Sequence, residues 1–239
     1  MSRPKIKICG LTRQRDATSC KELGIDFCGF IFHPDSPRNV KPETASILDT
    51  GSALRIGVFV NQSTEEVRHI MDFADLDMAQ LAGDQDVQFC AEVGPARVIR
   101  VFWPERYSGA DDIAADLKRF AGYTAYYLLD AGKSGGGSGR SLDFRRIQDL
   151  DPPKPWFLAG GLGPGNVSDA LGVLFGLMAA QFVRDGLRDA HVHLGEVDIE
   201  PEVAEAGQVL NARRVVQPVL DAKVILESHA VHGGARVEH

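Results

Sequence analysis

Cys9 is the first residue whose type and position could do chemistry. It ends the run KIKIC at residues 5–9, in which isoleucine alternates with lysine, and Gly10 breaks the run before a helix-forming stretch. A thiol at the carboxyl end of a strand, facing a loop, stands where α/β barrels place their catalytic groups. Most free cysteines are small buried hydrophobic residues, so position alone favours a structural role for Cys9.

Asp130 ends a second apolar run, YYLL at residues 126–129, and a glycine-rich segment follows it. Loop aspartates commonly accept backbone hydrogen bonds, and glycine-rich segments are often linkers. Apolar stretches flank this segment, and long loops in compact domains tend to be functional. We therefore expect it to act as a lid or to bring backbone amides to an anion, at Gly136, Gly137 and Gly139.

Gly160 and Gly161 follow a third apolar run, at residues 156–159, and lead through GPGNV into a predicted helix. Glycines here let backbone N–H groups point at a phosphate, and the helix terminus adds its partial positive charge. The loop after strand seven is the recurrent phosphate site of barrels. The pair is therefore predicted to bind phosphate.

Arg38 belongs to the loop HPDSPR at residues 33–38. Pro34 and Pro37 stiffen its backbone and would hold the arginine at the rim. A guanidinium fixed there could bind a carboxylate through two parallel hydrogen bonds. Because arginine is mostly exposed, a solvated surface turn is an equal alternative on sequence alone.

The apolar runs recur about every 20 to 30 residues, with helical periodicity between them, as repeated βα units require. At 239 residues the chain fits a single (β/α)8 TIM barrel domain, an α/β fold of about 250 residues. Seven βα units are recognisable in residues 5–174, and residues 175–239 are atypical.

The eighth strand has two candidates, residues 180–183 and residues 224–226. The first is close to unit seven but short. The second would need about 50 intervening residues, whereas βα connections usually have about 2 to 6 residues. It would place Ser228, Gly233 and Gly234 near the phosphate.

The composition excludes several classes. A net charge of −7 disfavours nucleic acid, whose binding needs a basic surface. No apolar run approaches the roughly 20 residues that cross a bilayer, and no charged and apolar leader opens the chain, which predicts a cytoplasmic protein with no membrane partner. The four cysteines are scattered, so neither a zinc site nor a disulfide framework is predicted.

Five segments taken together carry a family resemblance: KICGLT, GFIFHPDSPRNV, DLDMAQLAGD, YYLLDAGKSGGGSGRSLDF and FLAGGLGPGNV. From about residue 5 to residue 171 the chain resembles phosphoribosylanthranilate isomerase of tryptophan biosynthesis. The resemblance implies an Amadori rearrangement of a phosphorylated sugar-anthranilate, with Asp130 as the acid, Cys9 as the base and Arg38 on the anthranilate carboxylate. It implies no cofactor and no metal, and a monomer or homodimer.

Two departures from the family keep other functions open. Ala82 stands where the family typically has histidine, and the serine- and glycine-containing loop after strand eight is not visible. A catalytically silent phosphosugar-binding barrel is one alternative. The related aminoaldose isomerase of histidine biosynthesis is the other, although that enzyme uses an aspartate where Cys9 stands.

Overall fold

The computed structural model describes residues 5–130, 147, 150–162 and 223–228. The strands are β1 (Lys5–Cys9), β2 (Phe27–Ile31), β3 (Leu54–Phe59), β4 (Met78–Leu81), β5 (Val98–Phe102), β6 (Tyr126–Leu129), β7 (Trp156–Leu158) and β8 (Lys223–Ser228). The helices are α1 (Gln14–Glu22), α2 (Pro42–Ile47), α3 (Thr64–Phe73), α4 (Val87–Val93) and α5 (Ala110–Phe120). Each of these helices follows the strand of the same number, as the βα prediction requires.

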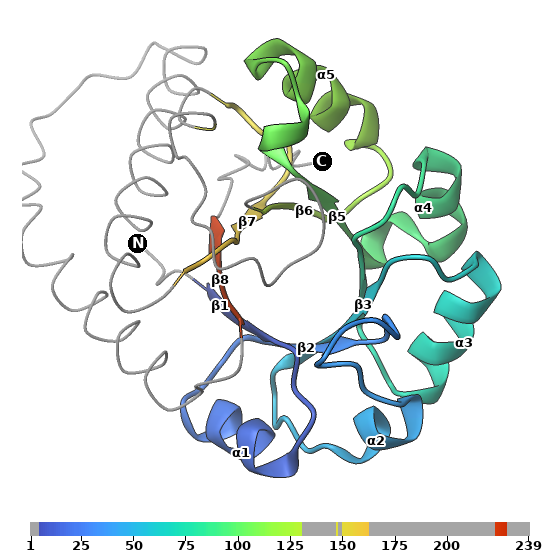
Figure 1. Ribbon diagram of the computed structural model, residues 1–239, viewed down its shortest axis with the longest axis vertical. Helices are drawn as coiled ribbons and strands as arrows, with labels where there is room; N and C mark the ends of the chain where they lie inside the picture. Colours follow the sequence, from blue (N-terminus) through green and yellow to red (C-terminus); the bar gives the residue numbers. More distant parts are fainter. Residues whose placement is uncertain (1–4, 131–146, 148–149, 163–222, 229–239) are drawn as a thin grey trace, which may run out of the picture.

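The strands form a closed barrel in the order β1 to β8 (Figure 1). Neighbours from β1 to β7 pair in parallel. Helices α1 to α5 lie outside this ring (Figure 1). The predicted α/β barrel is therefore confirmed, with its seven parallel strands in sequence order.

Strand β8 closes the ring but runs the opposite way. It pairs antiparallel with both β1 and β7, with Cys9 opposite Lys223 and Trp156 opposite Ser228. Of the two predicted candidates, the segment around residues 224–226 is thus the closing strand; residues 180–183 lie outside the described residues. The eighth unit is divergent in direction as well as in sequence.

The reversed direction overturns one expectation. Because Ser228 pairs with Trp156 at the start of β7, it lies at the amino ends of the parallel strands. The carboxyl ends of those strands carry Cys9 and Asp130, so Ser228 lies at the opposite end of the barrel from the predicted site. Gly233 and Gly234 lie outside the described residues.

Side-chain alternation divides each parallel strand between two packing layers. On β1, Ile6 and Ile8 belong to the large layer under the helices, whereas Cys9 belongs to the inner cluster. The inner cluster fills the barrel and consists of Cys9, Phe27, Ile31, Ile56, Val58, Met78, Ile99, Val101, Trp103, Leu128, Phe157 and Ala159. Residues near the carboxyl ends of the strands therefore face one enclosed interior.

Candidate active site

Cys9 lies at the carboxyl end of β1 and points into the barrel. Its side chain is 4% exposed and it is a free thiol. Lys7, two residues earlier on the same face of the strand, is 0% exposed. Lysine is almost never fully buried unless it is paired. The strand thus brings a buried cation and a buried thiol onto one face.

Gly29 provides the space for both side chains. It pairs with Cys9 across β1 and β2. A Cβ on Gly29 would lie 2.8 Å from Cys9 Sγ and 2.9 Å from Lys7 Nζ. Real Cβ atoms essentially never make contacts that short, so only glycine fits here without displacing its neighbours. The thiol and the ammonium group therefore approach each other over the bare backbone of β2.

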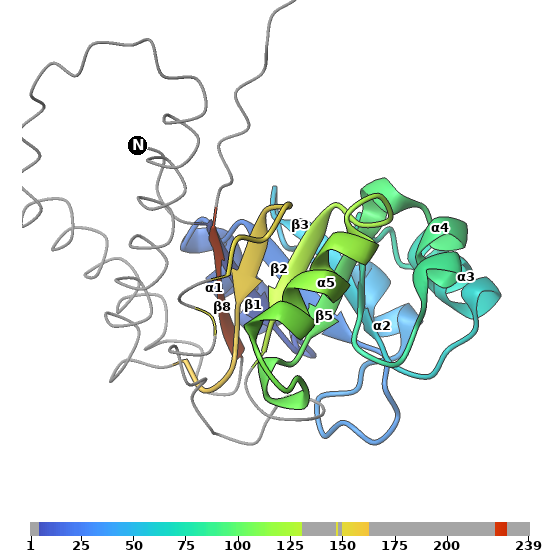
Figure 2. The same ribbon diagram turned by 90° about the horizontal axis from the view of Figure 1, so that it is seen from above.

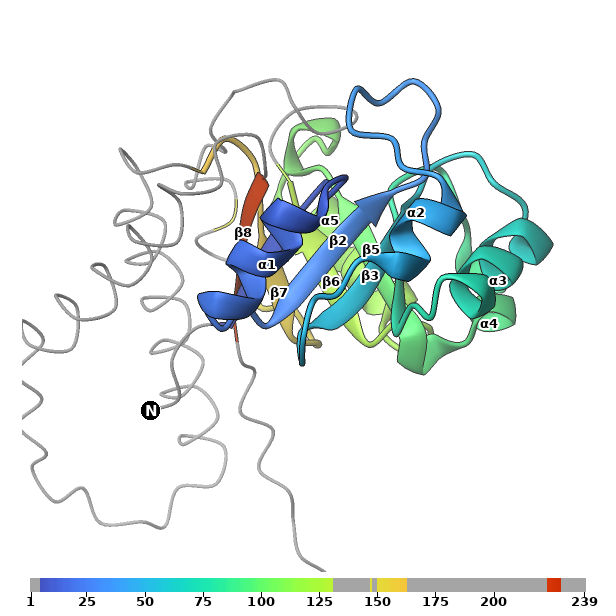
Figure 3. The same cartoon turned by 90° about the horizontal axis from the view of Figure 1, so that it is seen from below.

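Arg38 reaches the same end of β1 from the loop after β2, which projects beyond the strands (Figures 2 and 3). Its Nη1 donates a hydrogen bond to the Cys9 carbonyl oxygen at 2.8 Å. Gly10 has a left-handed φ of +91°, and a Cβ there would lie 2.7 Å from Arg38 Nη1. Gly10 and Gly29 thus leave the space that the side chains of Arg38 and Cys9 occupy.

The loop that carries Arg38 is folded back on itself. Ser36 N–H donates to the His33 carbonyl at 3.0 Å, and Ser36 Oγ accepts from Arg38 N–H at 3.2 Å. Val40 N–H then donates to the Ile31 carbonyl at 2.9 Å. These bonds hold Arg38 half-buried at the rim in an ordered turn.

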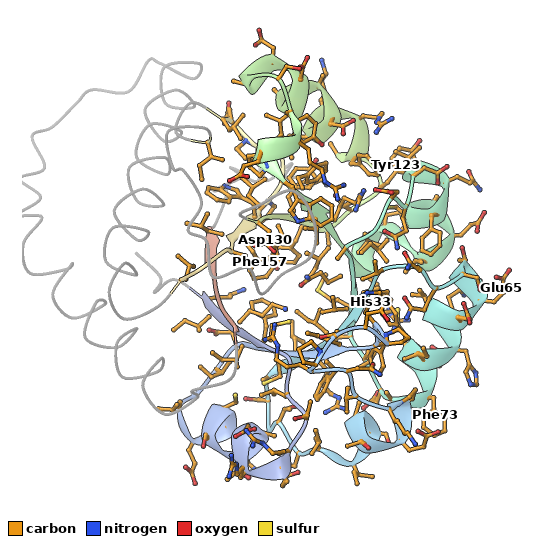
Figure 4. The ribbon with its side chains drawn as sticks, in the orientation of Figure 1. His33, Glu65, Phe73, Tyr123, Asp130 and Phe157 are labelled. Atoms are coloured by element: carbon orange, nitrogen blue, oxygen red, sulfur yellow. The ribbon has the colours of Figure 1, made fainter. Side chains whose placement is uncertain are left out.

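Asp130 follows β6 directly. Its backbone N–H donates to the Phe102 carbonyl at 3.0 Å, and the side chain is 5% exposed. Leu128 belongs to the inner cluster and Leu129 to the outer layer, so alternation turns Asp130 inward. Asp130 and Phe157 both lie inside the ring of strands (Figure 4). The carboxyl group therefore faces the same interior as Cys9.

Gly160 and Gly161 follow β7 at this end of the barrel. Their φ angles are +107° and +61°, in the region that favours glycine over residues with a side chain. The structure describes this predicted glycine turn as far as Leu162. Gly136, Gly137 and Gly139 lie outside the described residues.

Within the described ranges, no group of three or more His, Cys, Asp or Glu side chains is placed to hold a metal ion. In the same part of the chain, no helix has the length and apolar character needed to cross a membrane. What the described site holds is one buried thiol, one buried carboxyl group, one buried ammonium group and a rim guanidinium.

Comparison with known proteins assigns the family. The family model for N-(5'-phosphoribosyl)anthranilate isomerase matches residues 6–180. The isomerase of Desulfovibrio desulfuricans is 52% identical over 166 residues, which cover 70% of this chain and 79% of that protein. The chain belongs to the phosphoribosylanthranilate isomerase family. The match ends before the described closing strand, so β8 lies outside the part that the family model covers.

Solved isomerase structures share the fold. The phosphoribosylanthranilate isomerase of Thermotoga maritima matches with a TM-score of 0.61 and 32% identity, covering 70% of this chain and 82% of that one. Another solved isomerase is bound to reduced 1-(o-carboxyphenylamino)-1-deoxyribulose 5-phosphate; its TM-score is 0.56, with 29% identity and coverage of 70% and 80%. The predicted enzyme class and pathway are therefore confirmed at the level of this isomerase family.

Ala82, the departure from the isomerase pattern, lies just beyond β4. It packs against the inner cluster, and its N–H donates to the Phe59 carbonyl at 2.8 Å. The next residue is constrained, because a Cβ on Gly83 would lie 2.0 Å from the Val60 carbonyl oxygen. The backbone after β4 is thus fixed even though the imidazole is missing.

Three inward-facing residues were not predicted from the sequence: Lys7, Gln80 and Trp103. Among the described residues, Gln80 Oε1 and Trp103 Nε1 are buried without a hydrogen-bond partner. The Arg106 guanidinium lies 4.0 Å from the Trp103 ring centroid and 3.4 Å from Asp84. The alternation in KIKIC could have indicated Lys7, because it places Lys7 on the same face of the strand as Cys9. No sequence motif indicated Trp103.

Proposed function

We propose that this isomerase converts N-(5-phosphoribosyl)anthranilate to 1-(o-carboxyphenylamino)-1-deoxyribulose 5-phosphate with Asp130 as general acid and Cys9 as general base. The observation that carries the proposal is the burial of one thiol and one carboxyl group, each at the carboxyl end of a strand and each facing the barrel interior. Strands β1 and β6 are not neighbours in the ring, because β7 and β8 lie between them on one side and β2 to β5 on the other. The two groups can therefore address the sugar from different sides.

The chemistry needs one proton delivered and one removed. Asp130 donates a proton to the furanose ring oxygen, the C1–O bond breaks, and the anilino nitrogen lone pair forms the C1=N bond of a protonated Schiff base. Cys9 as a thiolate then removes the C2 proton, and the C2–H electrons form the C1=C2 bond of an enolamine. Tautomerisation, with protonation at C1, gives the ketone. General acid–base groups of this kind contribute roughly 10² to 10⁴ in rate.

Arg38 is proposed to bind the anthranilate carboxylate. A guanidinium has five N–H donors, and the bond from Nη1 to the Cys9 carbonyl occupies one of them. The remaining donors can bind a planar carboxylate in the bidentate manner. Because the anchor of Arg38 is the residue that carries the base, carboxylate binding also fixes the substrate relative to the thiol.

The phosphate is proposed to bind at Gly160 and Gly161 together with Gly136, Gly137 and Gly139. The positive φ angles at the first pair support this role. We also infer one barrel domain over residues 1–239, a cytoplasmic location and a monomeric or homodimeric state. The Thermotoga maritima isomerase is dimeric, and size-exclusion chromatography with light scattering would decide between the two states here.

The reaction can be tested against the two alternative functions. The purified chain is mixed in turn with phosphoribosylanthranilate and with the aminoaldose of histidine biosynthesis. We expect turnover of the first substrate only. Turnover of the second alone would favour the histidine-pathway isomerase, and binding of the product analogue without turnover of either would favour a silent barrel.

A further inference from the structure

Lys7 is the largest charged side chain enclosed by the described barrel. It lies in the middle of β1 and is fully buried. Removing an ammonium group from water is costly unless nearby groups compensate for the lost hydration. The residue lies inside the end of the barrel that holds the candidate site.

The side chain of Lys7 extends toward the carboxyl end of the barrel. Its Nζ lies 2.9 Å, and Cys9 Sγ 2.8 Å, from the same point, the position that a Cβ on Gly29 would occupy. No side chain separates the two groups at that point, because Gly29 has none. The two atoms are therefore within about 6 Å of each other, a range in which a positive charge favours the ionised form of an acidic group.

The other charged groups around Cys9 are few in the described residues. Arg38 contacts the Cys9 carbonyl, and Asp130 faces the interior from β6. From β2, Gly29 has no charge, and the Cys28 thiol is a second titratable group on which the Lys7 charge acts. From β8, Lys223 pairs with Cys9 through the backbone. Lys7 is therefore the buried cation placed beside the sulfur itself.

We propose that the Lys7 ammonium group keeps Cys9 in the thiolate form on which its role as general base depends. A positive charge beside a cysteine favours the thiolate, which is the reactive form. This inference rests on the proposed function for its catalytic meaning. Lys7 acts through Cys9 and is a positioning residue, since the structure places it below the sulfur and not at the rim.

The test measures the thiolate directly and does not use turnover. Iodoacetamide alkylates a thiolate: the sulfur forms a bond to the CH2 carbon, iodide leaves, and the thiol proton has already passed to solvent. The rate of Cys9 alkylation in the full chain is measured by peptide mass spectrometry between about pH 5 and pH 9, a range chosen to bracket free cysteine at about 8.5. Cys90 serves as an internal reference, because burial raises the pKa of its thiol to about 11.

Lys7→Met should slow the alkylation of Cys9 about tenfold at neutral pH, because the positive charge that favours the thiolate is lost. Lys7→Arg keeps the charge and should restore the wild-type profile. Lys5→Met is the matched control, since Lys5 lies on the same strand at the other end and contacts the Phe27 ring; its profile should not move.

A folded Lys7→Met protein with the wild-type alkylation profile would overturn the proposal, even if its turnover fell. If Lys7→Met does not melt cooperatively, Lys7→Gln is measured in its place against the same criterion. A chain that alkylates as expected but does not isomerise phosphoribosylanthranilate would contradict the proposed function and leave the relation between Lys7 and Cys9 intact.

Discussion

Arg38 Nη1 donates a hydrogen bond to the backbone carbonyl of Cys9 at 2.8 Å. The proposed carboxylate-binding residue is therefore anchored on the proposed base. Gly10 permits this contact, because any side chain there would meet the guanidinium. Binding and catalysis share one strand end, and changes to either residue should be separable by kinetics.

Arg38→Met should raise the Michaelis constant tenfold or more, since hydrogen bonds to charged groups contribute about 1.5 to 3 kcal/mol. Steady-state kinetics with phosphoribosylanthranilate would measure the change. Arg15→Met is the matched control, because the Arg15 side chain is 72% exposed on α1. An unchanged Michaelis constant for Arg38→Met would return this residue to a structural role in its loop.

Asp130→Asn keeps the shape of the side chain but cannot deliver the proton. It should lower turnover by about 10² to 10⁴, the range typical of a positioned acid. Affinity for the reduced product analogue should stay nearly constant, as measured by calorimetry. A variant that binds the analogue tenfold more weakly yet turns over normally would assign Asp130 to binding.

Gly29→Ala should displace both Cys9 and Lys7, because the new Cβ would lie within 3 Å of each side chain. Overpacking of this kind costs about 1 to 3 kcal/mol of stability, and we expect turnover to fall by more than tenfold in the folded fraction. Gly122→Ala is the control, since nothing lies within 4 Å of a Cβ there. Equal turnover in the two variants would show that the site tolerates the displacement.

Ending the chain after Leu210 removes β8 and leaves β1 and β7 without their shared partner. Unpaired strand edges are templates for aggregation, so this truncation should lose its cooperative melting transition or aggregate. Ending the chain after Ser228 keeps β8 and should leave the melting temperature nearly unchanged. A soluble, cooperatively folded Leu210 truncation would show that β8 is dispensable.

The sequence was sufficient for the parallel part of the barrel, because the apolar runs and their spacing determine where strands and helices alternate. It also placed Cys9 and Asp130 at the carboxyl ends of strands and Arg38 in the loop after β2. The direction of β8 could not be predicted, because a short apolar run pairs equally well in either direction. The enclosure of Trp103 depends on packing in the inner cluster, which no local sequence pattern records.

Lys7 shows a different kind of omission. The alternation in KIKIC predicts a strand, and the same alternation places the side chains of Lys7 and Cys9 on one face of that strand. The fate of Lys7 depends on Gly29, which is distant in sequence and adjacent only through the pairing of β1 with β2. The space beside Gly29, which lets Lys7 lie near the Cys9 thiol, is therefore visible only once the pairing of the two strands is known.

The most direct test of the proposed mechanism is the time course of phosphoribosylanthranilate isomerisation, followed by the fluorescence of the anthranilate ring, for the wild-type chain and for Cys9→Ser. The mechanism predicts turnover by the wild type and a loss of about 10² to 10⁴ in Cys9→Ser at equal thermal stability. A folded wild-type chain that binds the product analogue but does not isomerise the substrate would contradict it, as would a Cys9→Ser rate within threefold of the wild type.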